Sequence, residues 1–172
     1  MTRQEMTEIF SVMMLAYPNA EIFKGGIGKL KPTIELWTSC THDIDFWTGQ
    51  QAVKELCKTC KYPPTIAEFR EQAESFTARM DAYMDEVIRK IRNDSHLWGL
   101  QGFYDRIPEN DILRAAIGDI GGPGNLIRNL GGGKEMWEFG PLQDALRRRI
   151  RGSTPLPASG RKALTEGGDQ NA

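Results

Sequence analysis

Residues 62–92 have the sequence YPPTIAEFREQAESFTARMDAYMDEVIRKIR, which predicts a long amphipathic helix behind a stiff corner. The two prolines end any preceding helix, because proline has no backbone N–H to donate and restricts the residue before it. Thr65 and Glu68 have the spacing of a capping box, in which each side chain accepts a hydrogen bond from the other residue's backbone amide. Apolar residues then recur every three or four positions, at Ile66, Phe69, Ala73, Phe76, Met80, Tyr83, Val87 and Ile91. We therefore predict one helix of about seven turns, which ends near Asn93–Asp94 and serves as a connector.

Three shorter helices are predicted upstream of this segment. The first spans residues 2–17 and also begins with a capping-box spacing. The second covers about residues 32–42, and the third extends from its cap at Asp45 to the prolines. A glycine-rich stretch between the first and second helices predicts a flexible loop. Together these elements predict an all-α helical bundle over residues 1–92, whose core contains Phe10, Met13, Trp37, Phe46, Val53, Leu56 and Phe69.

The sequence changes character after this bundle. Residues 95–151 contain clustered glycines between two short periodic stretches, which predict helices over residues 110–119 and 140–151. Residues 152–172 are rich in Ser, Thr, Pro, Gly and charged side chains, and this composition predicts a disordered tail. The predicted fold is therefore all-α, with a small N-terminal bundle, a long connecting helix, a small helical C-terminal module with glycine-rich loops, and the tail.

Composition and charge exclude several classes of protein. The chain has 22 basic and 23 acidic side chains, so its net charge of -1 gives no general attraction to nucleic acid. No apolar run approaches the roughly 18 residues that a membrane span requires, and the N-terminus lacks the order of a secretory signal. The three cysteines are typical of a reducing compartment rather than a disulfide scaffold. We expect a cytosolic protein without a membrane partner.

The sequence contains no pattern typical of an enzyme. The glycine-lysine pairs at residues 28–29 and 133–134 both lack the preceding glycine and the following Ser or Thr of a phosphate-cradling loop. His42 and His96 are the only histidines, and neither accompanies a recognisable nucleophile motif. We predict a protein that is not an enzyme, with no cofactor and no small-molecule substrate of its own.

One group of residues has metal-ligand chemistry, namely Cys40, His42, Cys57 and Cys60. Thiolates and imidazoles are zinc's preferred ligands, and the spacing of the last two cysteines is common for a ligand pair. The first pair is spaced unusually tightly, however, and the cysteines also occupy positions where small apolar side chains pack. This second interpretation, buried reduced cysteines without stoichiometric zinc, is the one that the spacing favours.

Two further features suggest partner contacts. Positive charge is concentrated at Arg147, Arg148, Arg149 and Arg151, with Arg161 and Lys162 beyond them. Such a cluster is either a solvated helix face or a site for phosphates or carboxylates, on nucleic acid or on an acidic protein surface. Tyr62 precedes the two prolines at the corner between helices. It is either part of the turn that separates the helices or a protruding side chain that a partner protein binds. Four tryptophans (Trp37, Trp47, Trp98 and Trp137) could stack on bases, although helical spacing favours core positions.

Three motifs together resemble a known family: Ala16-Tyr17-Pro18-Asn19, Trp37 after Pro32-Thr33-Ile34-Glu35-Leu36, and Tyr62-Pro63-Pro64-Thr65-Ile66-Ala67-Glu68-Phe69-Arg70. Their order and spacing, over about residues 1–75, resemble the phage replicative-helicase loader and inhibitor family. In that family a small helical N-terminal domain precedes a flexible C-terminal part. The protein delivers or restrains the hexameric replicative helicase during phage replication.

The resemblance implies a DNA-replication accessory protein in the cytoplasm of a bacterial host cell. Its partner would be the replicative helicase, so ATP and magnesium would be the partner's cofactors. Candidate contacts to the helicase or to DNA are the four clustered arginines, Tyr62 and Phe69. Two alternatives stay open: a DNA-binding replisome organiser that uses the arginine cluster, and a phage inhibitor of a host defence or replication protein.

Overall fold

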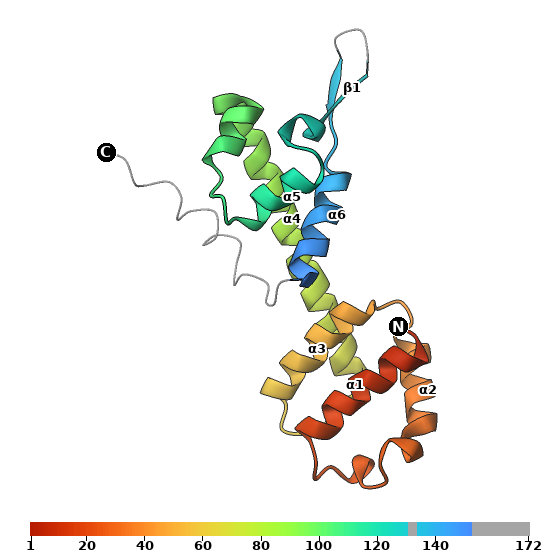
Figure 1. Cartoon of the computed structure of the whole chain (residues 1–172). Helices are drawn as coiled ribbons and strands as arrows, with labels where there is room; N and C mark the ends of the chain where they lie inside the picture. The colour runs from red at the N-terminus through yellow and green to blue at the C-terminus, as the bar shows by residue number, and fades with distance from the viewer. Residues whose placement is uncertain (131–133, 153–172) are drawn as a thin grey trace, which may run out of the picture. The chain divides into compact units, whose positions relative to one another are not determined.

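The computed structural model describes residues 1–130 and 134–152, and these form a mostly helical protein (Figure 1). The predicted disordered tail, apart from Gly152, lies outside the described residues, as do Arg161 and Lys162. The helices are α1 (Arg3–Ala16), α2 (Lys31–Cys40), α3 (Phe46–Thr59), α4 (Ile66–Arg106), α5 (Ile112–Asp119) and α6 (Gly140–Gly152). The chain divides into two compact units, Met1–Met80 and Asp81–Ala172. The division therefore falls inside α4, before residue 92, where the sequence places the end of the first domain.

The predicted helix starts of the first unit are confirmed. At α1 the Thr2 amide donates to Glu5 (2.6 Å) and the Glu5 amide donates to the Thr2 hydroxyl (3.3 Å). At α4 the Thr65 amide donates to Glu68 (2.7 Å), and the Glu68 amide donates back to the Thr65 hydroxyl (3.3 Å). Asp45 caps α3 through the Thr48 amide. Since the first amides of a helix have no partner within it, these side chains fix where each helix begins.

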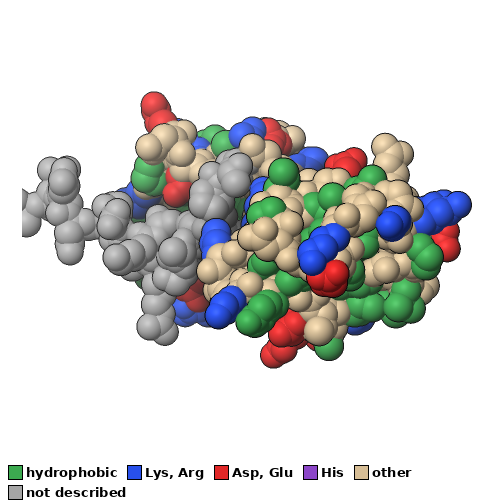
Figure 2. Space-filling view, turned by 90° about the horizontal axis from the view of Figure 1, so that it is seen from below, with side chains coloured by type: hydrophobic (Ala, Val, Ile, Leu, Met, Phe, Trp, Pro, Cys, Tyr) green, Lys and Arg blue, Asp and Glu red, His purple; other side chains and the backbone are tan. Residues whose placement is uncertain are grey.

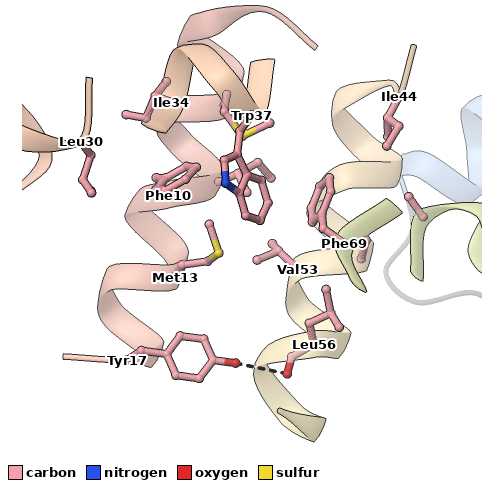
Figure 3. Packing of buried hydrophobic residues seen from close by; sticks show 14 of the residues in the cluster. Phe10, Met13, Tyr17, Leu30, Ile34, Trp37, Ile44, Val53, Leu56 and Phe69 are labelled. Carbon is pink, nitrogen blue, oxygen red and sulfur yellow. Dashed lines mark hydrogen bonds between the residues drawn. The ribbon is translucent and has the colours of Figure 1, made fainter. Parts of the chain in front are cut away.

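The core of the first unit is built around Trp37 (Figure 3). Its ring lies edge-on to Phe10, with centroids 5.2 Å apart, and to Phe69, with centroids 5.5 Å apart. Aliphatic side chains surround these rings on α1, α2 and α3. Every predicted core residue is buried except Phe46, which is partly exposed against the edge of the cluster.

One sequence prediction about this part of the chain is wrong. The long helix does not end near Asn93–Asp94. It continues to Trp98, because the first residue that breaks helical geometry is Gly99, with φ of 70°. A second helical stretch after this kink reaches Arg106. Asp94 instead pairs with Lys90 one turn earlier, at 2.9 Å, and so supports the helix. The predicted flexible loop after α1 contains two 3-10 turns, η1 (Glu21–Phe23) and η2 (Ile27–Leu30), each of which buries one apolar side chain.

The second unit contains the two predicted helices, α5 and α6, and the structure packs them against each other. Asp111 caps α5 through the Leu113 amide, at 2.7 Å. The fully buried side chains of this unit include Phe103, Leu113, Ile117, Leu126, Leu142 and Leu146. The prediction of an all-α fold misses only one small feature, an antiparallel hairpin of β1 (Ile127–Asn129) and β2 (Glu135–Trp137), which follows the 3-10 turn η3 (Pro123–Leu126). Strands of three residues are too short to show a period-2 pattern in the sequence.

An ion pair that is reinforced by one further hydrogen bond connects α4 to the turn between α2 and α3. The Arg70 guanidinium donates two hydrogen bonds of 2.9 Å to the Asp43 carboxylate and a third to the Cys40 carbonyl oxygen. Hydrogen bonding from Arg70 lowers the pKa of Asp43 from 3.8 to about 2. A carboxylate whose pKa is depressed by folding stabilises the native state above its unfolded pKa, and this contribution disappears as the pH falls through the folded value.

We therefore predict a pH-dependent effect of Asp43→Asn. The variant should melt at a lower temperature than the parent protein near neutral pH, and the difference should shrink as the pH falls from about 4 to about 2. Thermal unfolding followed by circular dichroism across this range measures the effect. Glu71→Gln removes an exposed carboxylate from α4, next to Arg70 in the sequence, and is the matched control. A melting-temperature difference that stays constant down to pH 2 would show that Asp43 acts through something other than its charge.

Candidate partner-binding surfaces

The arginine cluster lies on α6, and the structure separates its members. Leu142, Ala145, Leu146 and Ile150 form the buried face of this helix. With 3.6 residues per turn, Arg147, Arg148 and Arg151 point away from that face. Arg148 and Arg151 are exposed, and Arg147 is partly exposed, with ion pairs to Asp144 (3.8 Å) and Asp81 (3.6 Å). The outward face of α6 therefore carries Arg147, Arg148 and Arg151.

Arg149 has a different position from the other three arginines. Its guanidinium donates from Nε and Nη2 to both carboxylate oxygens of Asp119 at the end of α5. This contact holds the pKa of Asp119 below its usual value and raises the pKa of Arg149. Since a bidentate pair restricts the guanidinium to one geometry, Arg149 has a structural role between two helices.

The second candidate surface is an apolar groove of about 540 Å³ on the first unit. One wall comes from η1, with Ile22 and Phe23, and another comes from the corner Tyr62–Pro64. The side chains of Tyr62 (71% exposed) and Ile22 (48% exposed) project from the protein despite their large apolar area. Trp37 closes the groove from inside, so the surface joins the hydrophobic core. Exposed apolar side chains that gather around a hollow are typical of protein-binding sites.

The sequence located one wall of this groove but missed the other. Tyr62 stood out because two prolines follow it. Ile22 carried no signal, because it lies in a stretch whose glycines and missing periodicity predict a loop. Only the 3-10 turn, which buries Phe23 and turns Ile22 outward, brings the two walls together.

The structure corrects the use of Phe69 as a contact residue. Its side chain is completely buried between Trp37 and the neighbouring helices, so a partner cannot touch its ring in this fold. Its position confirms the core prediction. The residue can influence the groove only through the helix that carries it.

The structure provides no zinc ligand set for the cysteines and His42. Within residues 1–130 and 134–152, no three His, Cys, Asp or Glu side chains are placed to hold one metal ion. Cys57 and Cys60 end α3 beside Tyr17, whose hydroxyl lies 3.3 Å from the Leu56 carbonyl oxygen and 3.2 Å from that of Cys60. Burial raises the pKa of Tyr17 to about 12 and also raises that of Cys57. A raised thiol pKa disfavours the thiolate that zinc requires.

The surface chemistry of the described residues is mixed. Figure 2 shows acidic and basic side chains interspersed among apolar ones on one face of the molecule. Among the described helices, none is long and apolar enough to cross a membrane. Partner recognition would therefore depend on local features such as the groove and the outward arginines.

Comparison with known proteins finds a match within the first unit. Residues 1–70 match the family model for the N-terminal domain of the phage gene 39 protein. This match covers most of the Met1–Met80 unit and fits the N-terminal domain of a phage helicase loader or inhibitor, which confirms the resemblance seen in the three sequence motifs. It indicates a phage protein that interacts with a replicative helicase. No curated protein and no solved structure matches the chain significantly.

Proposed function

We propose that this protein binds a hexameric replicative helicase in the cytoplasm of the bacterial host and loads it on DNA or restrains it, without catalysis of its own. The family match over residues 1–70 is the observation that carries the proposal, because it coincides with a unit that has its own core. The absence of a phosphate-cradling loop and of a recognisable nucleophile motif in the sequence supports a binding role. ATP and magnesium are then the helicase's cofactors.

Each unit has one candidate surface for the helicase: an apolar groove on the first unit and a basic helix face on the second. The groove beside Tyr62 fits an apolar side chain or a short helix. The outward face of α6 fits an acidic surface, because Arg147, Arg148 and Arg151 present their guanidinium groups together. We assign the principal contact to α6, since arginine forks form directional bonds with carboxylates.

The test is binding of the full chain to purified phage and host helicases, measured by light scattering after size-exclusion chromatography and by titration. The variant R147Q/R148Q/R151Q leaves Arg149 in place, because Arg149 connects α5 and α6. We expect its affinity to fall by roughly 3- to 150-fold, if each charge contributes about 0.2–1 kcal/mol. Its melting temperature should stay nearly unchanged. K29Q/K31Q/K54Q removes three exposed lysines from the first unit and is the control for net charge.

The possible outcomes separate the two surfaces. Unchanged binding by the arginine variant together with weaker binding by Tyr62→Ala would place the contact in the groove. Leu15→Ala, which truncates an exposed side chain on α1 (84% exposed), controls for general loss of apolar surface. If neither helicase forms a complex with the parent protein at micromolar concentrations, the proposed function is wrong. Helicase activity on DNA with and without the protein then distinguishes loading from restraint.

The replisome-organiser alternative rests on the same three arginines. If they bind DNA phosphates, affinity for DNA must fall steeply with salt, and the slope must become smaller in the arginine variant. Strong duplex binding with this behaviour would favour an organiser over a helicase-binding adaptor.

A further inference from the structure

The second unit contains a hollow of about 430 Å³ between α4 and the hairpin. Arg92, Ser95 and His96 line it from α4, at spacings of three and four that place them on one helical face. Ile127 and Trp137 line it from the hairpin. These two residues are cross-strand partners, so their side chains share one face of the ladder. Leu100, just beyond the Gly99 kink, completes the wall.

Trp137 is held in place by an aromatic stack. Its ring is parallel to that of Phe139, with centroids 5.2 Å apart and planes inclined by 8°. The Arg92 guanidinium lies 5.3 Å from the centroid of the Phe139 ring. One side of the indole is therefore supported by Phe139, and the cation stands next to the same pair of rings. A tryptophan fixed in this way is a rigid platform for a planar ligand.

Two polar side chains at the hollow, those of Arg92 and Ser95, lack the ion pair or hydrogen bond that such groups usually form. On the same helix Arg89 pairs with Glu86 and Lys90 pairs with Asp94. Arg92, by contrast, forms no ion pair with any residue that the structure describes. The Ser95 hydroxyl oxygen is buried and is the one such side-chain atom in the described parts of the chain without a hydrogen-bond partner. A buried hydroxyl without a partner is energetically unfavourable, and a ligand with a polar edge would offer it one after a change of rotamer.

We propose that this hollow binds a nucleotide of single-stranded DNA, with the base against the Trp137 indole and the phosphate beside the Arg92 guanidinium. A flat aromatic face, a guanidinium without an ion pair among the described residues and an unsatisfied hydroxyl match the base, the phosphate and the polar edge of one nucleotide. Single-stranded DNA leaves its base faces open to an aromatic side chain, whereas a duplex covers them by stacking. The proposed site is distinct from the outward face of α6 and does not depend on the helicase contact.

The site agrees with the charge of the whole protein. A net charge of -1 provides no general field for DNA, so a DNA contact must use local groups. Stacking on Trp137 with one phosphate contact would give weak, sequence-tolerant binding. Its salt dependence would be shallow, because the number of neutralised phosphates sets the slope.

The test is fluorescence anisotropy of a labelled oligothymidylate titrated with the full chain. Trp137→Ala should weaken binding by about 5- to 150-fold, as expected for the loss of one base-stacking contact. Trp137→Phe keeps an aromatic ring and should restore most of the affinity. Arg92→Gln should weaken binding and reduce the salt slope by roughly 0.7, the value for one phosphate contact on a single strand.

Controls separate this site from other aromatic and basic side chains. Trp98 is 46% exposed in the same unit but does not line the hollow, so Trp98→Ala should bind the oligonucleotide like the parent protein. R147Q/R148Q/R151Q should also retain binding. If Trp137→Ala does not fold, as judged by circular dichroism, the weaker binding and smaller salt slope of Arg92→Gln carry the comparison.

Several results would overturn the proposal. These are no binding of the oligonucleotide by the parent protein, equal loss in the Trp98→Ala and Trp137→Ala variants, unchanged binding by the Arg92→Gln variant, and tighter binding of duplex than of single strands. A free nucleoside monophosphate that competes as strongly as the oligonucleotide would show a small-molecule site instead. If Trp137→Ala loses helicase binding but keeps oligonucleotide binding, the hollow is a protein contact. Failure of the helicase complex alone leaves this proposal standing, because the oligonucleotide assay contains no helicase.

Discussion

Replacement of Trp37 by alanine is expected to lower the free energy of unfolding by about 3–5 kcal/mol, the usual cost of deleting a buried aromatic side chain. Trp37 is only 6% exposed, and its ring contacts aromatic rings from both ends of the first unit, Phe10 on α1 and Phe69 on α4. The truncation would remove the centre of this arrangement and open a cavity next to the groove. Because small domains are stable by only about 5–15 kcal/mol, this loss is a large part of the total.

Chemical denaturation of the parent protein and the variant measures this loss. The adjacent Leu36, on the same helix, is 56% exposed, so Leu36→Ala is the matched control and should cost less than about 0.5 kcal/mol. Tryptophan fluorescence is unsuitable as the probe, since the variant lacks one of the indoles. Far-UV circular dichroism is therefore preferred. An unchanged denaturation midpoint for Trp37→Ala would remove Trp37 from the core and contradict the packing of α1, α2 and α4.

Much of the first unit could be predicted from the sequence because its signals are local. A capping box specifies a helix start within four residues, as Thr65 and Glu68 show, and an apolar stripe specifies which face is buried. Both depend on residues less than two turns apart. The stripe from Phe69 to Ile91 accordingly matches the buried residues of α4.

Features that depend on distant residues could not be predicted in this way. The polar residues near Asn93 contain no breaker, and whether a helix continues through them depends on the tertiary packing that follows. The apolar residues after the kink, such as Phe103, are buried in a unit whose other buried side chains include those of α5 and α6. The hairpin likewise needs a helix face to pack against, because two short strands alone are marginal in water.

The candidate sites also depend on residues that are distant in the sequence, and to that extent they could not be predicted from it. Sequence spacing found the concentration of arginines but could not show that Asp119, 30 residues away, pairs with Arg149 and leaves the other three on the surface. It named Phe69 both as core and as contact, and burial decides between these roles. The hollow beside Trp137 gave no recognisable signal, because its residues come from a helix and a hairpin that only the fold brings together.

The second unit can be tested through Leu146, whose side chain is completely buried on the inner face of α6. Leu146→Ala should lower the stability of this unit by about 2–5 kcal/mol, from the lost burial and the cavity left behind. Hydrogen exchange measured by mass spectrometry should show faster exchange of α5 and α6 amides, since these two helices pack on each other. This variant also tests the separation of the proposed sites. It keeps the outward arginines and the hollow's own side chains, so lower affinity for helicase or oligonucleotide would report how far each surface depends on an ordered α6.

The control for this variant is Leu130→Ala, at the end of the hairpin, where the side chain is 54% exposed. It removes the same atoms from the same unit without opening a cavity, so exchange in α5 and α6 should stay as in the parent protein. Equal protection of these helices in the Leu146 variant would mean that α6 is not packed through this face. The three arginines would then no longer be fixed in one outward direction, and the assignment of the helicase contact to α6 would lose its structural basis.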